Sequence, residues 1–522
     1  MSASTNGAAL SRRGFLAGTG GALAMFALAA CTPGGAAGSG KEYSLLLPGV
    51  APTGNWNGVL AALNKKLQAD KGFTIKPEFI NWTNYPTQSV LKFTSGEKFQ
   101  TALSARWLNM QKLVASKAIV GLSDKLNSGQ YSNITKTVSK RVIDSNLWDG
   151  QLYGIPAVNT AARVINFTVR GDLVDKYAHG ELADYDALEK FWYDIKQHES
   201  GMTPYVDSGN SALIDVIGSP TASWTRAAWE NPNRMPVGFS NNSILYFPAL
   251  DATKTGSANL VPFYEDQNSI DSMKLVRKYY QDGIINADAL NTDAATRDGL
   301  FNQGGAATVW AITDGTATSS HLPLLKKAVP NASVMTVLPF RDGKKAKPNQ
   351  TFQADNQVVV NARGDVDAAL ELIDWVSIKE NHDLLQYGIE GTDWKAVGDT
   401  KYRQVSDYNG FPGYALSWRV PLERRSTDIS ESEAGWLDWA QDYNNFTTDP
   451  FATFIPDLTP VQKEDAQVQA ALVQYGLPLA VGAVDVDKGL SDLKKAVDTA
   501  GADKVREELE KQANAYLKKQ KK

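Results

Sequence analysis

Apolar and polar positions near the start of the chain alternate with two different periods. The stretch YSLLLPGV, from Tyr43, is continuously apolar and predicts a strand, and FTIKPEFINW, residues 73–82, has the alternation of a second strand. Between them, four residues share one face of a predicted helix: Val59, Leu60, Leu63 and Leu67. A strand, a helix and a strand at this spacing predict a βαβ unit, a mainly parallel sheet and an α/β fold.

The same alternation continues toward the C-terminus. Further helices are predicted near residues 87–93, 185–200, 269–283, 369–376 and 505–519, and further strands near 101–107, 162–170, 306–315, 332–340 and 355–363. The segment LWDGQLYGIPAVN carries Gly150, Gly154 and Pro156 within seven positions, which suits a crossing between two lobes. The chain is therefore expected to leave its first lobe and later return to it.

Length and charge narrow the class of protein. A chain of 522 residues, 43% hydrophobic and 21% charged, exceeds what one compact core usually holds, so two lobes are expected. The formal net charge is −4, and apart from the KKQKK tail no basic run occurs, so no nucleic-acid partner is expected. One cysteine and four histidines without metal-ligand spacing predict no disulfide framework, no metal site and no cofactor.

The first thirty residues have the layout of an export signal. Arg12 and Arg13 precede an uncharged segment, residues 14–30, which at 17 residues is marginal for a membrane span. Residues 11–16 resemble the twin-arginine export motif, and Leu28, Ala29, Ala30 and Cys31 resemble a bacterial lipobox. That resemblance implies removal of residues 1–30, lipid attachment to Cys31, and anchoring at the outer face of the cytoplasmic membrane. A buried structural cysteine is the alternative.

Residues 31–40 are small, flexible and uncharged, which is the composition of a tether. Gly35 to Lys41 has the spacing of a phosphate-binding loop, but Glu42 stands where that motif has Ser or Thr, and no strand precedes it. We interpret this stretch as a tether and expect no nucleotide site.

Several stretches, in order, carry a family likeness. They are LWDGQLYGIP, INFTVRGDLVDKYA, VMTVLPF, DWVSIKENHDLLQYGIEGTDWK and GADKVREELEKQANAYL. Together they resemble the extracellular solute-binding proteins, family 1, of bacterial ABC importers, and within them the LplA-like lipoproteins. The resemblance implies a two-lobed, periplasmic-binding-protein-like (Venus flytrap) α/β fold, with a ligand held between lobes joined by crossing segments.

Applied to this chain, the resemblance implies that lobe one is residues 41–156 plus 337–392 and that lobe two is residues 157–336 plus 393–522. A monomer that delivers its ligand to a membrane permease is implied. Many LplA-like members have an acidic calcium loop, but KQHESGMTPYVD, residues 196–207, lacks the carboxylates for it.

A sugar-binding cleft needs flat aromatic faces and planar polar groups, and this chain has 13 tryptophans. Candidates at strand ends and beyond the predicted crossing are Asn55, Trp56, Trp82, Arg106, Trp107, Asn159, Trp310, Asp355 and Asn356. The resemblance favours Trp310 as a stacking residue. Trp394 and Arg419 are further candidates, although Trp394 could instead fill the hinge and Arg419 could pair with a carboxylate.

Trp375, Trp436 and Trp439 lie within helical patterns and are expected in the core. The predicted function is capture of an oligosaccharide without turnover. Two alternatives remain at this point: an exported glycoside hydrolase using a pair of carboxylates about 5 to 9 Å apart, and a surface carbohydrate-binding adhesin.

Overall fold

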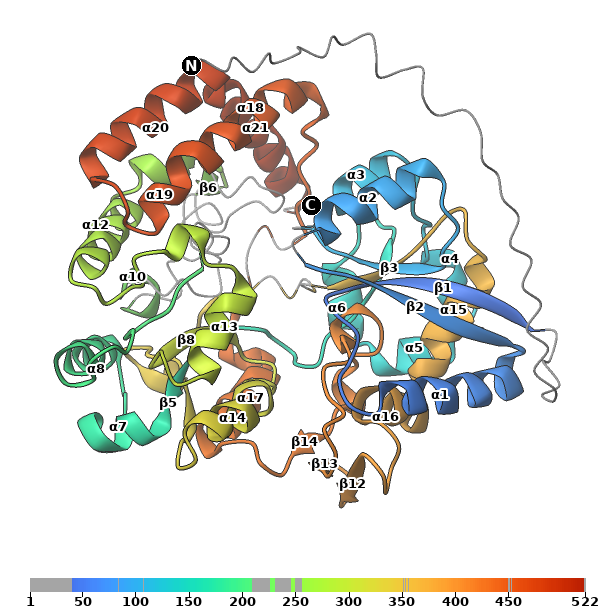
Figure 1. Ribbon diagram of the computed structural model, residues 1–522. Coiled ribbons are helices and arrows are strands. Elements are labelled where there is room, and N and C mark those ends of the chain that lie inside the picture. Colours follow the sequence, from blue (N-terminus) through green and yellow to red (C-terminus); the bar gives the residue numbers. More distant parts are fainter. Residues whose placement is uncertain are drawn as a thin grey trace, which may run out of the picture. The chain divides into compact units, whose positions relative to one another are not determined.

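A computed structural model describes residues 40–82, 84–106, 108–208, 226–230, 246–248, 256–350, 352, 354, 356–448, 451 and 453–520. From Lys41 onward the chain forms one compact unit (Figure 1). The predicted signal peptide, most of the tether, and the candidate residues Cys31, Trp107 and Asp355 lie outside the described residues.

The first sheet has the strand order β2-β1-β3-β11-β4. Its strands are β1 (Lys41–Pro48), β2 (Phe73–Ile80), β3 (Thr101–Ser104), β4 (Gly154–Pro156) and β11 (Gln357–Val360). The predicted βαβ unit is present, since β1 pairs in parallel with both β2 and β3. The late strand β11 is antiparallel to β3 and β4, so the sheet is mixed. Leu45, Leu46 and Leu47 are fully buried, which explains the continuous apolar run.

Helices pack around this sheet, with α2 and α3 on one face and α1 and α16 on the other (Figure 1). Their bounds are α1 (Trp56–Lys71), α2 (Tyr85–Ser95), α3 (Met110–Ala115), α4 (Ser123–Asn127), α5 (Ser132–Thr137), α6 (Lys140–Ser145), α15 (Val366–Val376) and α16 (Lys379–Tyr387). Val59, Leu63 and Leu67 of α1 are buried as the helical period predicts. The helix ends at Gly72, whose φ of 77° is the left-handed conformation that glycine adopts most easily.

The second sheet has the order β8-β5-β9 and is antiparallel throughout. Its strands are β5 (Ile165–Arg170), β8 (Thr308–Ile312) and β9 (Val334–Val337), and its neighbouring helices are α7 (Gly171–Ala178), α8 (Tyr185–His198), α13 (Ala294–Asn302), α14 (Ala317–Ala328) and α17 (Glu431–Gln441). Trp192 of α8 is fully buried and lies edge-on to Phe167 of β5 at 5.6 Å. Large aromatic side chains therefore fix this helix on the sheet.

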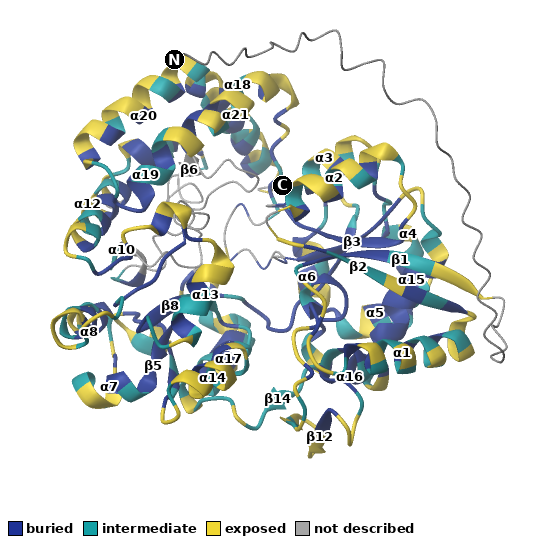
Figure 2. Ribbon diagram, in the orientation of Figure 1, coloured by how far each residue is buried: buried dark blue, intermediate teal, exposed yellow. Residues whose placement is uncertain are grey.

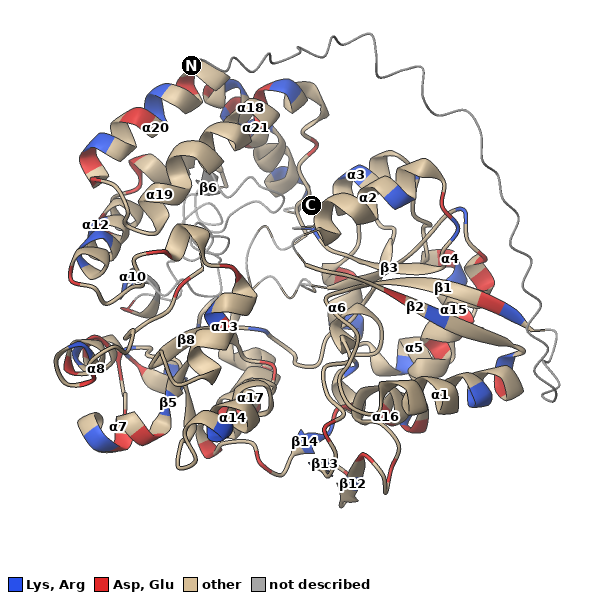
Figure 3. Cartoon of the chain, in the orientation of Figure 1, with Lys and Arg blue, Asp and Glu red and all other residues tan. Residues whose placement is uncertain are grey.

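The C-terminal part is helical. It consists of α18 (Gln462–Ala471), α19 (Leu477–Ala480), α20 (Val486–Ala500) and α21 (Ala502–Gln520), with a π-helical turn over Leu472–Gly476, and packs with α12 (Gln267–Gln281). Val505, Leu509 and Ala513 are buried on one face of α21, as predicted. Figure 3 shows basic and acidic residues interspersed along outer helices such as α20.

Shorter elements complete the described structure. They are α10 (Arg226–Glu230), β6 (Tyr246–Pro248), β7 (Leu260–Pro262), β10 (Asn349–Gln350), β12 (Trp394–Val397), β13 (Lys401–Gln404), β14 (Arg425–Ser426) and β15 (Thr447–Thr448). The strands β12, β13 and β14 form a small sheet of their own.

Buried side chains form two large hydrophobic cores, visible as dark regions in Figure 2. The predicted α/β class with a two-lobed organisation is confirmed. Two segments pack on a different core from the one expected. Val337, Leu338 and Phe340 belong to the second core, because β9 pairs with β5. Tyr408 and Trp418 belong to the first core, so the chain crosses back later than residue 392.

Among the helices that the structure describes, none is both long and apolar enough to cross a membrane. Within the same residues, no group of three or more His, Cys, Asp or Glu side chains could hold a metal ion.

Candidate functional site

A cleft of about 950 Å³ is lined by residues of both cores. This volume is near the upper end of the range of small-molecule sites, about 300 to 1,000 Å³. One wall is formed by β8, α13 and the start of α14, and the other by residues 408–421, β13 and the end of α16. A ligand in the cleft would therefore contact residues of both cores at once.

Trp310, on β8, lies on the wall from the second core and is half-buried. The guanidinium of Arg297 lies 4.5 Å from the centre of its ring, and the same guanidinium pairs with Asp298 at 2.8 Å. The indole Nε1 of Trp310 is buried and has no partner among the described residues. Arg297 thus covers part of the ring system and leaves the indole N–H for a ligand.

Asn159 lies beside this wall at the crossing between the two cores. Its Nδ2 donates to the carbonyl of Asp314 at 2.7 Å, which fixes the amide orientation because a carbonyl can only accept. Its Oδ1 is then left buried without a donor among the described residues. Arg163 pairs with the carboxylate of Asp314 at 3.3 Å, so Asp314 contacts both Arg163 and Asn159 at the edge of the cleft.

The N-terminus of α14 is hydrogen-bonded to a carboxylate from another helix of the protein. Glu433, from α17, accepts hydrogen bonds from the backbone N–H groups of Ala317 at 2.8 Å and Thr318 at 2.9 Å. Burial raises the pKa of Glu433, although these hydrogen bonds oppose the shift. Two of the N–H groups that this helix start would offer to an anion are therefore already occupied.

The opposite wall is aromatic. Tyr408, Phe411, Tyr414 and Trp418 all line the cleft from one loop segment, and we call these four residues the aromatic wall. The rings of Tyr414 and Trp418 meet edge-to-face with centres 5.6 Å apart. Aromatic rings of this kind offer the apolar faces on which pyranose rings stack.

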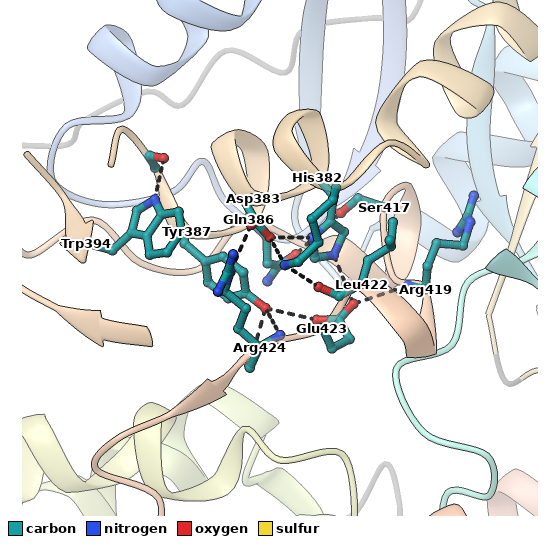
Figure 4. Close-up of polar contacts among 12 residues, drawn as sticks. His382, Asp383, Gln386, Tyr387, Trp394, Ser417, Arg419, Leu422, Glu423 and Arg424 are labelled. Carbon is teal, nitrogen blue, oxygen red and sulfur yellow. Dashed lines mark hydrogen bonds and ion pairs between the residues drawn. The ribbon is translucent and has the colours of Figure 1, made fainter. Parts of the chain in front are cut away.

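The same side of the cleft also has a network of polar side chains, His382, Asp383, Tyr387, Glu423 and Arg424, which we call the polar cluster (Figure 4). His382 is fully buried between Asp383 at 3.2 Å and Glu423 at 3.1 Å. Burial alone would lower the pKa of His382, but the neighbouring carboxylate of Glu423 and that of Asp383 outweigh it and raise the pKa. Arg424 donates to Asp383 at 2.8 Å.

The polar cluster reaches the cleft through Tyr387, Glu423 and Arg424, which are lining residues. The Tyr387 hydroxyl donates to Glu423 at 3.3 Å and accepts from the backbone N–H of Arg424 at 2.7 Å. The carboxylate of Glu423 is held by His382 and Tyr387, and the guanidinium of Arg424 is held by Asp383. These contacts restrict the motion of both lining groups.

Comparisons with known proteins agree with this architecture. The chain is 23% identical over 482 residues to a carbohydrate ABC transporter substrate-binding protein of Streptococcus pneumoniae serotype 4, and the match covers 90% of this chain and 89% of that protein. Residues 450–518 match a domain of unknown function, DUF3502.

Among solved structures, the chain resembles the N-glycan transport solute-binding protein NgtS of Streptococcus pneumoniae in complex with Man1GlcNAc, with a TM-score of 0.70 and 19% identity over 92% of this chain and all of that one. The chain therefore has the fold of this solute-binding protein. The alginate-binding protein AlgQ2 is a more distant match, with a TM-score of 0.62 and 14% identity over 90% of this chain and 97% of that one. The resemblance inferred from the sequence motifs is therefore confirmed.

Two of the predicted site residues, Asn159 and Trp310, line the cleft. Trp82 and Trp56 contact the aromatic wall from outside the lining. The ring of Trp82 stacks on Tyr414 at 6.0 Å and its Nε1 donates to the Tyr414 hydroxyl at 3.2 Å. Trp56 is buried with its ring 6.0 Å from that of Phe411. Both tryptophans support the wall in the structure described.

The structure places five other candidates in supporting positions rather than among the lining residues. Asn55 donates to Asp393 at 3.1 Å, and the backbone carbonyl of Asn356 accepts from Ala157 at 3.0 Å. Arg106 is buried 5.0 Å above the Trp148 ring, and burial lowers the pKa of its guanidinium to about 10.

Trp394 is buried and donates to the carbonyl of Gly388 at 2.9 Å, while Arg419 is fully buried and donates to Ser377 and to the carbonyl of Trp418. Trp375 and Trp439 are buried in the cores as expected, and Trp436 packs partly buried against the second core.

Sequence reasoning missed the aromatic wall, Arg163, Arg297 and the polar cluster. The wall comes from YNGFPGYALSW, residues 408–418, which has four aromatic residues in a segment broken by two glycines and a proline. Four aromatic rings in a segment interrupted by glycine and proline were the available signal. The arginines carried no local signal, because their partners are distant in sequence.

Proposed function

We propose that this solute-binding protein is the substrate-binding component of an ABC importer and that it captures an oligosaccharide in the cleft. The observation that carries the proposal is the pairing of flat aromatic faces on opposite walls, Trp310 on one and the aromatic wall on the other. Two similarities support the proposal. The pneumococcal relative is a carbohydrate ABC transporter substrate-binding protein, and structures of NgtS contain Man1GlcNAc or Man5GlcNAc.

In this proposal the protein acts as a monomer and captures its ligand without chemical change. The first lobe centres on the core of residues 45–158 and 354–418, and the second on residues 162–352 and 439–517. Because the cleft is lined from both cores, a sugar bound to both walls would favour a closed arrangement over an open one. The permease would then recognise the ligand-bound form.

Ligand binding is the direct test. We expect a saturable rise in melting temperature with a panel of oligosaccharides that includes Man5GlcNAc, because a ligand present at 100 times its Kd stabilises the folded protein by about 2.7 kcal/mol. The sugar should be recovered unchanged by chromatography after long incubation. If no oligosaccharide shifts melting, or if the bound sugar is cleaved, the proposal is wrong.

We further propose that residues 1–30 are removed after twin-arginine export, that Cys31 is lipidated, and that residues 31–40 tether the protein at the outer face of the cytoplasmic membrane. The order of the basic pair, the apolar segment and Cys31 supports this. Two acyl chains anchor a protein far more stably than one.

Replacing Cys31 with Ser should move the exported protein from the membrane fraction to the medium, because the serine hydroxyl cannot form the thioether. Fractionation and immunoblotting would measure this. The adjacent change Thr32→Ala should leave the protein in the membrane fraction. Retention of the Cys31→Ser protein on membranes would contradict lipid anchoring through this residue.

A further inference from the structure

We propose that the cleft selects uncharged oligosaccharides and discriminates against those that carry a carboxylate. This inference rests on the proposed function and narrows its substrate class. The observation behind it is that the charged side chains lining the cleft, except Lys401, are paired within the protein, while the atoms left without partners suit hydroxyl groups.

The arginines of the second-core wall are each paired with a carboxylate. Arg163 pairs with Asp314 at 3.3 Å, and the side chains of both are nearly buried. Arg297 pairs with Asp298 through two of its nitrogens, at 2.8 and 2.9 Å. The buried carboxyl of Asp207 also interacts electrostatically with Arg297. A carboxylate on a ligand would have to compete with these internal partners.

The charges of the opposite wall are paired in the same way. Arg424 pairs with Asp383 at 2.8 Å, Glu423 pairs with His382 at 3.1 Å, and Arg425 pairs with Asp438 at 2.5 Å. Lys401 is the one lining cation for which no ion pair is found among the described residues, and it is exposed on β13. Burial lowers the pKa of His321, so its imidazole adds no positive charge at neutral pH.

Displacing an internal carboxylate by a ligand carboxylate is unfavourable. The displaced aspartate would lose its partner in a partly buried cleft, and the two carboxylates would repel each other at short range. The anion-binding potential of the α14 start is likewise occupied by Glu433. Apart from the exposed Lys401, the cleft therefore offers no unpaired cation to an acidic sugar in the part of the chain that the structure describes.

The unpartnered buried atoms point to hydroxyl groups instead. Asn159 contributes an acceptor, its Oδ1, while Trp310 contributes a donor, its Nε1, and Arg297 contributes a second donor, its Nη1. A sugar hydroxyl both donates and accepts, so it can satisfy either kind of atom. A carboxylate only accepts, and it would leave Asn159 Oδ1 unsatisfied.

The test compares matched ligands. Oligosaccharides from a broad panel would be measured beside counterparts whose terminal primary hydroxyl has been oxidised to a carboxylate, using calorimetry at low ionic strength. We expect neutral members to bind about tenfold more tightly than their carboxylated counterparts, with the ratio shrinking as salt is added. Equal or tighter binding of carboxylated members overturns this inference but leaves the proposed function intact. If neither the neutral nor the carboxylated oligosaccharides bind, both this inference and the proposed function are wrong.

Two variants test whether the paired charges, rather than the shape of the cleft, cause the preference for neutral ligands. Asp298→Asn and Asp314→Asn each remove the charge of one carboxylate paired with an arginine, and each should lower the preference for the neutral ligand by about threefold or more. The matched control is Asp144→Asn, which breaks the exposed pair with Lys140 outside the cleft and should not change the ratio. Circular dichroism would verify folding. An unchanged ratio in both folded cleft variants would contradict the role of the paired charges.

Discussion

Replacing Trp310 with Ala is expected to weaken oligosaccharide binding by about 2 to 3 kcal/mol, or roughly 30- to 150-fold, because a central tryptophan in a desolvated site carries a large share of binding energy. The change removes both the stacking face and the unpartnered Nε1. It also removes the ring beneath Arg297, so the guanidinium loses its cation–π contact. Isothermal titration calorimetry with a sugar identified by the melting screen would measure the loss.

Two further variants make the Trp310 experiment decisive. Trp310→Phe keeps an aromatic face without the indole N–H and should lose less affinity than Trp310→Ala. Trp436→Ala removes a partly buried tryptophan that does not line the cleft, and it should leave affinity unchanged in the folded protein. Unaltered affinity in Trp310→Ala would show that the sugar does not stack on this residue.

Replacing Asp383 with Ala is expected to lower the free energy of unfolding by about 3 to 5 kcal/mol, because removing one partner of a buried ion pair leaves the others uncompensated. The Asp383 side chain is only 7% exposed and contacts Lys379 at 2.6 Å, Arg424 at 2.8 Å and His382 at 3.2 Å. Urea denaturation followed by tryptophan fluorescence would measure the change.

The matched control is Asp144→Ala, which removes the exposed partner of Lys140 on α6. Exposed ion pairs of this kind contribute about 0.5 kcal/mol or less. Asp383→Ala should also weaken sugar binding, since Arg424 and Tyr387 reach the cleft from the polar cluster. A loss of stability no larger than that of the control would mean that the polar cluster does not stabilise the fold.

Most helices and strands of this protein follow from local patterns. The apolar run at Leu45–Leu47, the helical face of Val59, Leu63 and Leu67, and the final helix were predicted close to their observed positions. These elements can be predicted from the sequence because buried side chains recur with the period of the helix or the strand that carries them. The direction of β11 was not readable, because antiparallel pairing with β3 depends on a partner more than 250 positions earlier.

Of the candidate site, sequence reasoning identified Trp310 and Asn159, both at places where a strand or a crossing meets the cleft. It also named the loops after β1, β2 and β3, whose tryptophans Trp56 and Trp82 instead contact the aromatic wall from outside the lining. It named none of residues 408–418 as a candidate.

The sequence by itself determined the α/β class, the order of the elements and the family likeness, because each depends on short, contiguous stretches. Only the tertiary structure decided which arginines are neutralised and which rings form the cleft. Arg163 and Asp314 are 151 positions apart, and Asn55 and Asp393 are 338 apart. Such pairs arise from the packing of distant segments, and no local period of the chain encodes them.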